Sequence, residues 1–207
     1  LQMKAKSEFV ERKRNATQVQ FDKQEGLKQV AIACVPERMR YTLTEFFVTP
    51  GQPIKLVFTN PDATDHNLVF VRPGSLEAVG MAANNMARDP KFANSDFIPA
   101  EEEQKILRHT PMIGPTRKAK IHVLRFRAPQ KPGVYPYVCT FPGHWIVMKG
   151  NMVVAESDAE AEALLAEARK ESRFVRDWKV EDLAKDVEAL SGRSFEMGKH
   201  IFAVGRC

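Results

Sequence analysis

Cys139, His144 and Met148 lie close together in this chain, spaced as C-x4-H-x3-M between two predicted strands. They offer a thiolate, an imidazole and a thioether as donor groups. Soft sulfur ligands favour copper, whereas zinc sites use cysteine, histidine and carboxylates, and calcium prefers oxygen. The residue types and their spacing therefore indicate a copper site.

A trigonal copper site of the electron-transfer kind needs one cysteine, two histidines and a weak axial methionine. The second histidine has to come from another part of the chain, and His66, at the start of an apolar strand, is the candidate. We interpret the remaining histidines, His109, His122 and His200, as surface or strand residues. Cys34 is interpreted as a small buried apolar residue.

Short strands separated by turn residues have to position these ligands. Runs of β-branched and aromatic residues bounded by Pro, Gly, Asn and Asp predict strands at residues 29–35, 45–48, 54–60, 66–72, 104–110, 118–128, 133–140 and 150–155. Residues 75–96 interrupt the strands and predict a helical turn or two followed by a loop. Many short strands with few helices between them indicate an antiparallel sandwich or barrel.

Composition divides the 207 residues into three predicted parts. Residues 1–28 are highly charged and are expected to form a short solvated helix or a linker to something upstream. Residues 29–155 form the β domain, and residues 156–207, rich in Ala, Glu, Lys and Leu, form a helical extension. The extension starts at a capping box, residues 157–160, and two further short helices are predicted around residues 178–190 and from Ser194.

Composition also excludes several classes of protein. The 31 Lys and Arg against 26 Asp and Glu give a net charge of +5, too small and too mixed to indicate a nucleic-acid-binding protein. No stretch reaches the roughly 18 apolar residues that a membrane-spanning helix needs. The sequence contains no H-x-H pair, which argues against the additional copper ligands of a multicopper oxidase or a nitrite reductase.

The run CTFPGHWIVMKG, residues 139–150, resembles the copper-binding loop of azurins, the bacterial blue-copper branch of the cupredoxin family. Plastocyanin-like members space the cysteine and histidine as C-x2-H, so the x4 spacing is typical of azurins. The resemblance covers residues 29–155. It implies a Greek-key cupredoxin sandwich with a short helical flap, and one type 1 copper ion that cycles between Cu(I) and Cu(II) without catalysing a reaction.

The resemblance also implies a role for individual residues. His66, Cys139 and His144 correspond to the equatorial ligands, and Met148 to the axial one. His144, with Trp145 beside it, corresponds to the port through which electrons enter and leave. The residues that the resemblance places around the ligands are Asp65, Asn67, Thr140, Phe141 and Pro142.

These surrounding residues have different implied tasks. Asn67 fixes the ligand loop by hydrogen bonding near Cys139, and Phe141 and Pro142 shield the metal from water. Azurins have a glycine where this chain has Asp65, so a contact from the backbone carbonyl of this residue to copper is left open. The structural disulfide of azurins has no counterpart here.

Several alternatives remain at this point. A copper storage or delivery protein, or the redox module of a larger oxidoreductase, would use the same ligands. Trp145 either packs on a neighbouring element or widens an apolar patch around His144. The narrow copper hyperfine splitting of a caged site would separate an electron carrier from a storage protein.

The end of the chain carries a second resemblance. Residues 198–202, GKHIF, precede Cys207, as a G-K-x-x-F helix precedes the C-x-x-C-H haem attachment of c-type cytochromes. The alternative is a terminal helix that ends on an ordinary cysteine. We expect a piece of a longer protein, and the azurin resemblance implies a bacterial protein that works in the periplasm or elsewhere outside the cytoplasm. Its predicted redox partner is a c-type cytochrome, which the cytochrome resemblance would place in the same polypeptide.

Overall fold

The structure is a computed structural model and describes residues 16–171 and 194–205. The chain divides into two compact units, residues 1–168 and 169–207. In the second unit the described part contains helix α5 (Phe195–Gly205), whose first turn is capped by the Ser194 hydroxyl accepting from the Met197 amide at 3.2 Å. The helix predicted around residues 178–190 lies outside the described residues.

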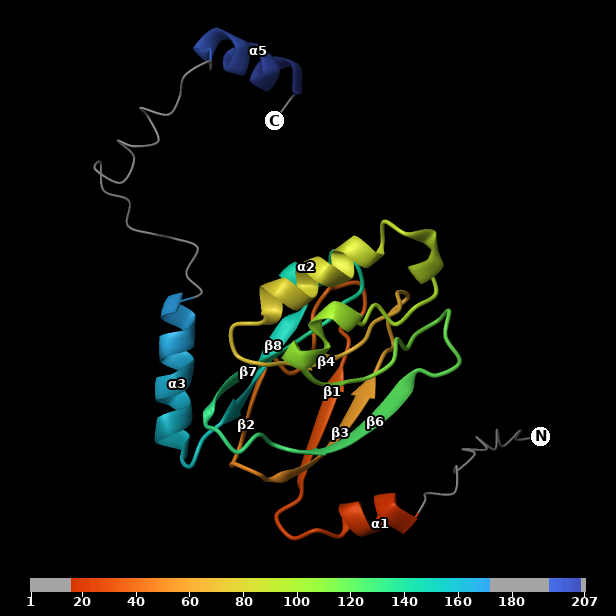
Figure 1. Cartoon of the computed structure of the whole chain (residues 1–207), viewed down its shortest axis with the longest axis vertical. Coiled ribbons are helices and arrows are strands. Elements are labelled where there is room, and N and C mark those ends of the chain that lie inside the picture. The colour runs from red at the N-terminus through yellow and green to blue at the C-terminus, as the bar shows by residue number, and fades with distance from the viewer. Residues whose placement is uncertain (1–15, 172–193, 206–207) are drawn as a thin grey trace, which may run out of the picture. The chain divides into compact units, whose positions relative to one another are not determined.

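The first unit is a sandwich of two β-sheets (Figure 1). One sheet has the order β1 (Lys28–Ala33), β3 (Pro53–Thr59), β6 (Ile121–Arg127). The other has the order β2 (Glu45–Val48), β8 (Lys149–Val154), β7 (Gly133–Val138), β4 (Val69–Val71), β5 (Ile106–His109). All eight predicted strands are present within the described residues, with ends shifted by a few positions.

The expectation of purely antiparallel pairing was wrong for two strand pairs. β1 runs parallel to β3, and β2 runs parallel to β8. The reason is that β2 belongs to the opposite sheet from β1 and β3. The chain therefore leaves the first sheet after β1 and passes through β2 in the second sheet. It re-enters the first sheet as β3, which runs in the same direction as β1. Strand periodicity reports which face of a strand is buried, and it carries no information on such a crossover.

The core lies between the two sheets and is centred on aromatic side chains. Tyr41, Phe70 and Tyr137 are fully buried, and the ring centroids of Tyr137 lie 5.6 Å from Tyr41 and 5.4 Å from Phe70. β3 alternates buried and half-buried residues, as a strand with one face in the core must. The Tyr41 hydroxyl donates to the Asn67 carbonyl oxygen at 2.6 Å, so the core holds the segment that precedes β4.

The flap is longer than the predicted turn or two of helix. It contains α2 (Leu76–Met86) and two short 3-10 helices, η1 (Pro90–Phe92) and η2 (Ala100–Lys105). Val79 of α2 is fully buried in a small cluster with residues of β4 and β7, and this packing stabilises a helix whose own sequence contains poor helix formers such as Gly80 and Asn84.

The helices that flank the β domain in the sequence, α1 and α3, contact the sandwich. In α1 (Ala16–Asp22), the Asp22 carboxylate accepts from Lys55 Nζ at 2.8 Å and from Arg125 Nε at 2.8 Å, which attaches this part of the charged N-terminal segment to β3 and β6. α3 (Asp158–Glu171) begins as predicted, with the Ser157 hydroxyl accepting from the Glu160 amide. Its apolar face packs on β2 and β8. Among the described residues, no helix is long and apolar enough to cross a membrane.

Candidate metal centre

Three of the predicted ligands come together at one end of the sandwich. Cys139 directly follows β7, His144 opens the 3-10 helix η3 (His144–Ile146), and His66 lies three residues before β4. Cys139 Sγ lies 3.7 Å from His66 Nδ1 and 3.7 Å from His144 Nδ1, and the two nitrogen atoms lie 3.2 Å apart. Within the described residues this is the only group of His, Cys, Asp and Glu side chains with the spacing of a metal site.

The size of this triangle fits a transition-metal ion. The point equidistant from the three donor atoms lies about 2 Å from each of them, and metal–imidazole bonds are about 2.0–2.1 Å long. One sulfur and two imidazole nitrogen atoms in a triangle are the equatorial set of a trigonal copper site. The described part of the chain brings neither His109 nor His122 to this group, in agreement with their interpretation as strand residues.

The loop after β7 holds its own ligands by short backbone hydrogen bonds. The His144 amide donates to the Phe141 carbonyl at 3.0 Å, the Met148 amide to the His144 carbonyl at 2.8 Å, and the Cys139 amide to the Met148 carbonyl at 3.0 Å. Gly143 makes the turn possible because its φ of +85° lies in the left-handed region that glycine adopts without strain. Met148 is fully buried, and its backbone is thus tied to both other loop ligands.

The surroundings affect the protonation of Cys139 and of His144 in different ways. Burial raises the pKa of the Cys139 thiol to about 12, and backbone amides of Asn67 and Phe141 oppose that effect by hydrogen bonding to the sulfur. Those amides would stabilise the thiolate that a metal requires. Burial and the neighbouring His66 ring lower the pKa of His144 to about 4. At neutral pH His144 is therefore an uncharged imidazole, which is the form that binds metals.

Asn67 connects the two segments that carry the ligands. Its side-chain oxygen accepts from the Thr140 amide at 2.8 Å, and its side-chain nitrogen donates to the Thr140 hydroxyl at 2.7 Å. The same nitrogen donates to the Asp96 carbonyl at 2.9 Å. These contacts join the strand that follows His66 to the loop that starts at Cys139.

Apolar side chains cover the ligands. The Phe141 ring lies 4.6 Å from the His144 ring and 5.8 Å from the Phe97 ring, centroid to centroid. Pro142 is half-buried beside Phe141. The neighbours Ile146 and Val147 leave 56% and 54% of their surface exposed.

Trp145 packs inward, which is one of the two alternatives left open by the sequence. Its indole ring lies so close to α2 that a Cβ atom added at Gly80 would be 2.3 Å from Trp145 Cδ2. Its indole nitrogen is buried and has no hydrogen-bond partner. The Gly143 amide also donates to the Asn84 side-chain oxygen at 2.8 Å. The flap helix α2 therefore supports the ligand loop at two points.

The Asp65 carboxylate bonds to residues that are not among the proposed ligands. Its carboxylate accepts from the hydroxyl and the amide of Thr116 and from Arg117 Nε, the last at 3.0 Å. This network fixes the chain immediately before His66. The His66 amide also donates to the Ile113 carbonyl at 3.0 Å, and the Ile113 amide donates back at 2.8 Å.

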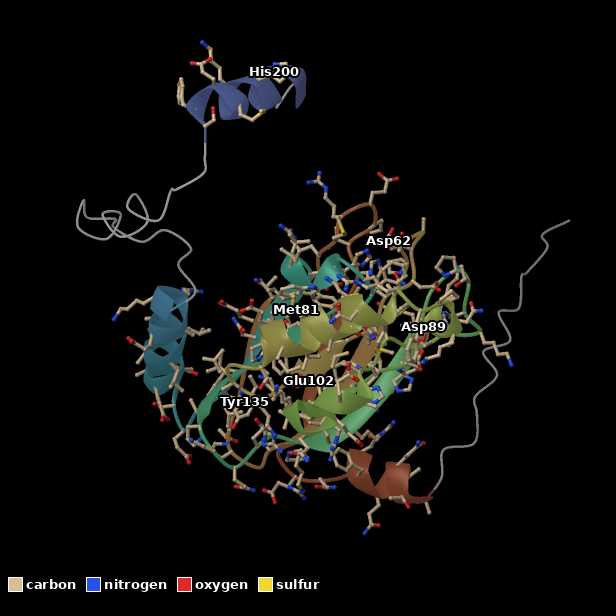
Figure 2. All side chains as sticks on the ribbon, turned by 45° about the horizontal axis from the view of Figure 1, so that its top comes forward. Asp62, Met81, Asp89, Glu102, Tyr135 and His200 are labelled. Atoms are coloured by element: carbon tan, nitrogen blue, oxygen red, sulfur yellow. The ribbon has the colours of Figure 1, made fainter. Side chains whose placement is uncertain are left out.

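Sequence reasoning missed Asp62. Its Oδ2 atom lies 3.0 Å from His66 Nε2, the ring nitrogen that does not face Cys139. Figure 2 shows Asp62 at one end of the β domain and Tyr135, near the start of β7, toward the other. The sequence signal was an aspartate four residues before the histidine, in an Asn-Pro-Asp turn, and such a turn has no specific link to metal binding.

Known proteins resemble this chain over the same region. Residues 28–155 match the copper-binding proteins of the plastocyanin/azurin family. Auracyanin-A of Chloroflexus aurantiacus is 29% identical over 130 residues, covering 62% of this chain and 75% of the relative. Azurin of Alcaligenes faecalis is 30% identical over 95 residues, covering 44% of this chain and 65% of the relative. The solved structure of dithionite-reduced auracyanin from Roseiflexus castenholzii matches with a TM-score of 0.52 and 36% identity, covering 62% of this chain and 97% of that one.

Proposed function

Because this chain belongs to the plastocyanin/azurin family of copper-binding proteins, we propose that His66, Cys139, His144 and Met148 bind one type 1 copper ion, which cycles between Cu(I) and Cu(II). The resemblance to azurins and the cupredoxin sandwich expected from it are confirmed, and with them copper as the cofactor and electron transfer as the general function. The identity of the four ligands and the type of copper centre are the proposal.

The observation that carries the proposal is the convergence of Cys139, His66 and His144 in a buried, pre-formed triangle. Both residues that face Cys139 are held by backbone hydrogen bonds that do not involve the metal. A site fixed in this way keeps nearly the same geometry in both oxidation states, so little rearrangement accompanies the gain or loss of an electron. This favours rapid transfer over chemistry on a substrate.

When bound, copper supplies the one-electron couple. The protein residues hold the ion, limit the access of water and provide the path to a partner. Cys139 would hold the ion as a thiolate, and the Asn67 and Phe141 amides would stabilise its negative charge by hydrogen bonding to the sulfur. Phe141 packs on the His144 ring, where it would restrict the access of water to the metal. His144 remains half-exposed, whereas His66 and Cys139 are buried, so His144 offers the shortest path to a partner.

We propose a carrier rather than an enzyme, with a redox protein such as a c-type cytochrome as partner, working in the periplasm or otherwise outside the cytoplasm. Carrier contacts are typically small, below about 1,200 Å² of buried surface, because the partners must separate quickly. A storage or delivery protein would expose exchangeable ligands. The burial of Cys139 and His66 argues against that alternative.

The test is spectroscopic. Addition of Cu(II) to the purified chain should produce an intense visible band from thiolate-to-copper charge transfer, a narrow copper hyperfine splitting, and a reversible one-electron titration. A colourless adduct with the wide splitting of ordinary Cu(II) would overturn the proposal and favour storage or adventitious binding.

A further inference from the structure

We infer that the carboxylate of Asp62 is a positioning residue for the copper centre: it orients His66 and favours Cu(II) over Cu(I), so that it lowers the reduction potential. This inference rests on the proposed function, because it assumes that His66 is a copper ligand. It concerns a residue that neither the ligand motif nor its spacing indicated.

The geometry divides the two nitrogen atoms of His66 between two tasks. Nε2 lies 3.0 Å from Asp62 Oδ2, whereas Nδ1 faces Cys139 Sγ at 3.7 Å and His144 Nδ1 at 3.2 Å. A neutral imidazole has one N–H donor and one lone pair. A carboxylate can only accept, so it selects the form with the proton on Nε2 and the lone pair on Nδ1, pointing toward the metal position.

Asp62 is itself held in place before any metal binds. Its other oxygen, Oδ1, accepts from the Ala63 amide at 2.7 Å and from the Glu37 amide at 3.2 Å. Glu37 lies in the loop between β1 and β2, with a left-handed φ of 58° that few non-glycine residues adopt. The Asp62 amide donates to the Asn60 side-chain oxygen at 3.0 Å. With Oδ1 occupied by backbone donors, Oδ2 remains for His66.

The charge of Asp62 is poorly screened. Its side chain is only 8% exposed, and in the described part of the chain it forms no ion pair with Lys or Arg. A buried anion that bonds to a ligand makes the ligand more basic and stabilises the ion of higher charge more strongly.

Two substitutions remove different parts of the Asp62 side chain. Asp62→Ala removes the charge and both acceptor oxygens, whereas Asp62→Asn removes the charge and keeps one acceptor oxygen, for which His66 Nε2 competes with the Ala63 and Glu37 amides. Asp22→Asn is a matched control, because Asp22 is also a well-buried carboxylate, 12% exposed, but bonds to Lys55 and Arg125 on a sheet that carries no proposed ligand.

Competition with chelators should measure the affinities for Cu(II) and for Cu(I), together with the reduction potential. Removing a residue that supports a metal ligand typically costs about 10–100-fold in affinity. We expect this loss for Cu(II) in Asp62→Ala, with a smaller loss for Cu(I). Each tenfold decrease in the ratio of the Cu(II) affinity to the Cu(I) affinity raises the reduction potential by about 59 mV. Asp62→Asn should raise the potential with a smaller loss of affinity, and Asp22→Asn should change neither quantity.

A second measurement uses the metal-free protein. Nitrogen-15 NMR of the apo chain should show His66 protonated at Nε2, and Asp62→Ala should lose this preference. Wild-type potential and affinities in both Asp62 variants, or an apo wild-type His66 protonated at Nδ1, would overturn the inference. A wild-type protein without a blue band would instead overturn the proposed function, so the two failures are distinguishable.

Discussion

Two segments meet at the copper site, and they are held in place mainly by different kinds of hydrogen bond. The loop from Cys139 to Met148 is stabilised by its own backbone, through hydrogen bonds between residues three to nine positions apart. The segment from Asn60 to Asn67 is stabilised by distant residues. Asn60 donates to the Ile113 carbonyl, and Asp62 accepts from the Glu37 amide.

This difference decides what the sequence could reveal. Because the hydrogen bonds of the loop are mainly local, consecutive residues carry most of its requirements, and their spacing predicted three ligands and the metal. Most hydrogen bonds of the other segment join it to residues 25 to 73 positions away. His66 could be named as a candidate because it is a histidine at the start of an apolar run. Asp62 could not, since its role exists only when the ring of His66 has been placed.

The same distinction applies to the fold. The eight strands were predictable because the alternation of apolar and polar residues along a strand is a local pattern. The parallel pairs depend instead on which sheet the chain enters after β1. The length of α2 was underestimated because Val79 and Gly80 stabilise it through contacts with β4, β7 and Trp145. Trp145 itself offered two alternatives from the sequence, and only the position of α2 decides between them.

The largest effect on the copper spectrum should come from removing the sulfur of Cys139 in the ligand loop. Cys139→Ser replaces the thiolate with a hydroxyl that does not ionise at neutral pH, so the intense visible band should be lost completely. Visible absorption after Cu(II) addition measures this. Cys34→Ser is the matched control, because Cys34 is the other free and buried cysteine of the described residues. Retention of the blue band in Cys139→Ser would exclude Cys139 as the ligand.

A change at the other end of the same loop should leave the copper bound and shift its potential. Met148→Leu removes a sulfur that donates electron density to Cu(II), so we expect the reduction potential to rise. Cyclic voltammetry measures the shift. Met152→Leu provides the control, because Met152 is equally buried but lies on β8, away from the ligand loop. A fall in potential in Met148→Leu would contradict axial ligation.

The bond between the two segments can be tested at Asn67. Asn67→Ala leaves the buried Thr140 amide without its acceptor, and unsatisfied buried groups cost about 1–3 kcal/mol each. We expect unfolding of the apo protein by urea to show a loss of that size, together with weaker copper binding. Asn85→Ala, at an exposed position on α2, should change little. Equal stability of the two variants would mean that the segments are positioned independently.

The support that α2 gives to the loop is tested by adding one methyl group. Alanine in place of a helical glycine normally stabilises by about 1 kcal/mol. Gly80→Ala should instead destabilise, by about 1–3 kcal/mol, because its Cβ would overlap the Trp145 ring. The copper hyperfine splitting should change as η3 shifts. Gly198→Ala in α5 is the control and should not destabilise, because among the described residues nothing beyond the adjacent helix backbone lies within 4 Å of an added Cβ atom. A stabilised Gly80→Ala protein would show that Trp145 moves freely.

The smallest effect on copper should come from an ion pair that lies on the ligand-free sheet. Hydrogen bonds from Lys55 and Arg125 outweigh burial and hold the pKa of Asp22 well below its ordinary value of about 3.9. The stabilisation is therefore complete above about pH 4 and is lost as the pH falls. At pH 7, Asp22→Asn should lower the free energy of unfolding by about 2 kcal/mol, and this difference should narrow in urea titrations at pH 3.

Because the ligand loop and the Asn60–Asn67 segment are held without Asp22, the absorption spectrum and the reduction potential of Asp22→Asn should remain those of the wild type. A changed spectrum would show that the copper site depends on the whole sandwich rather than on its two segments.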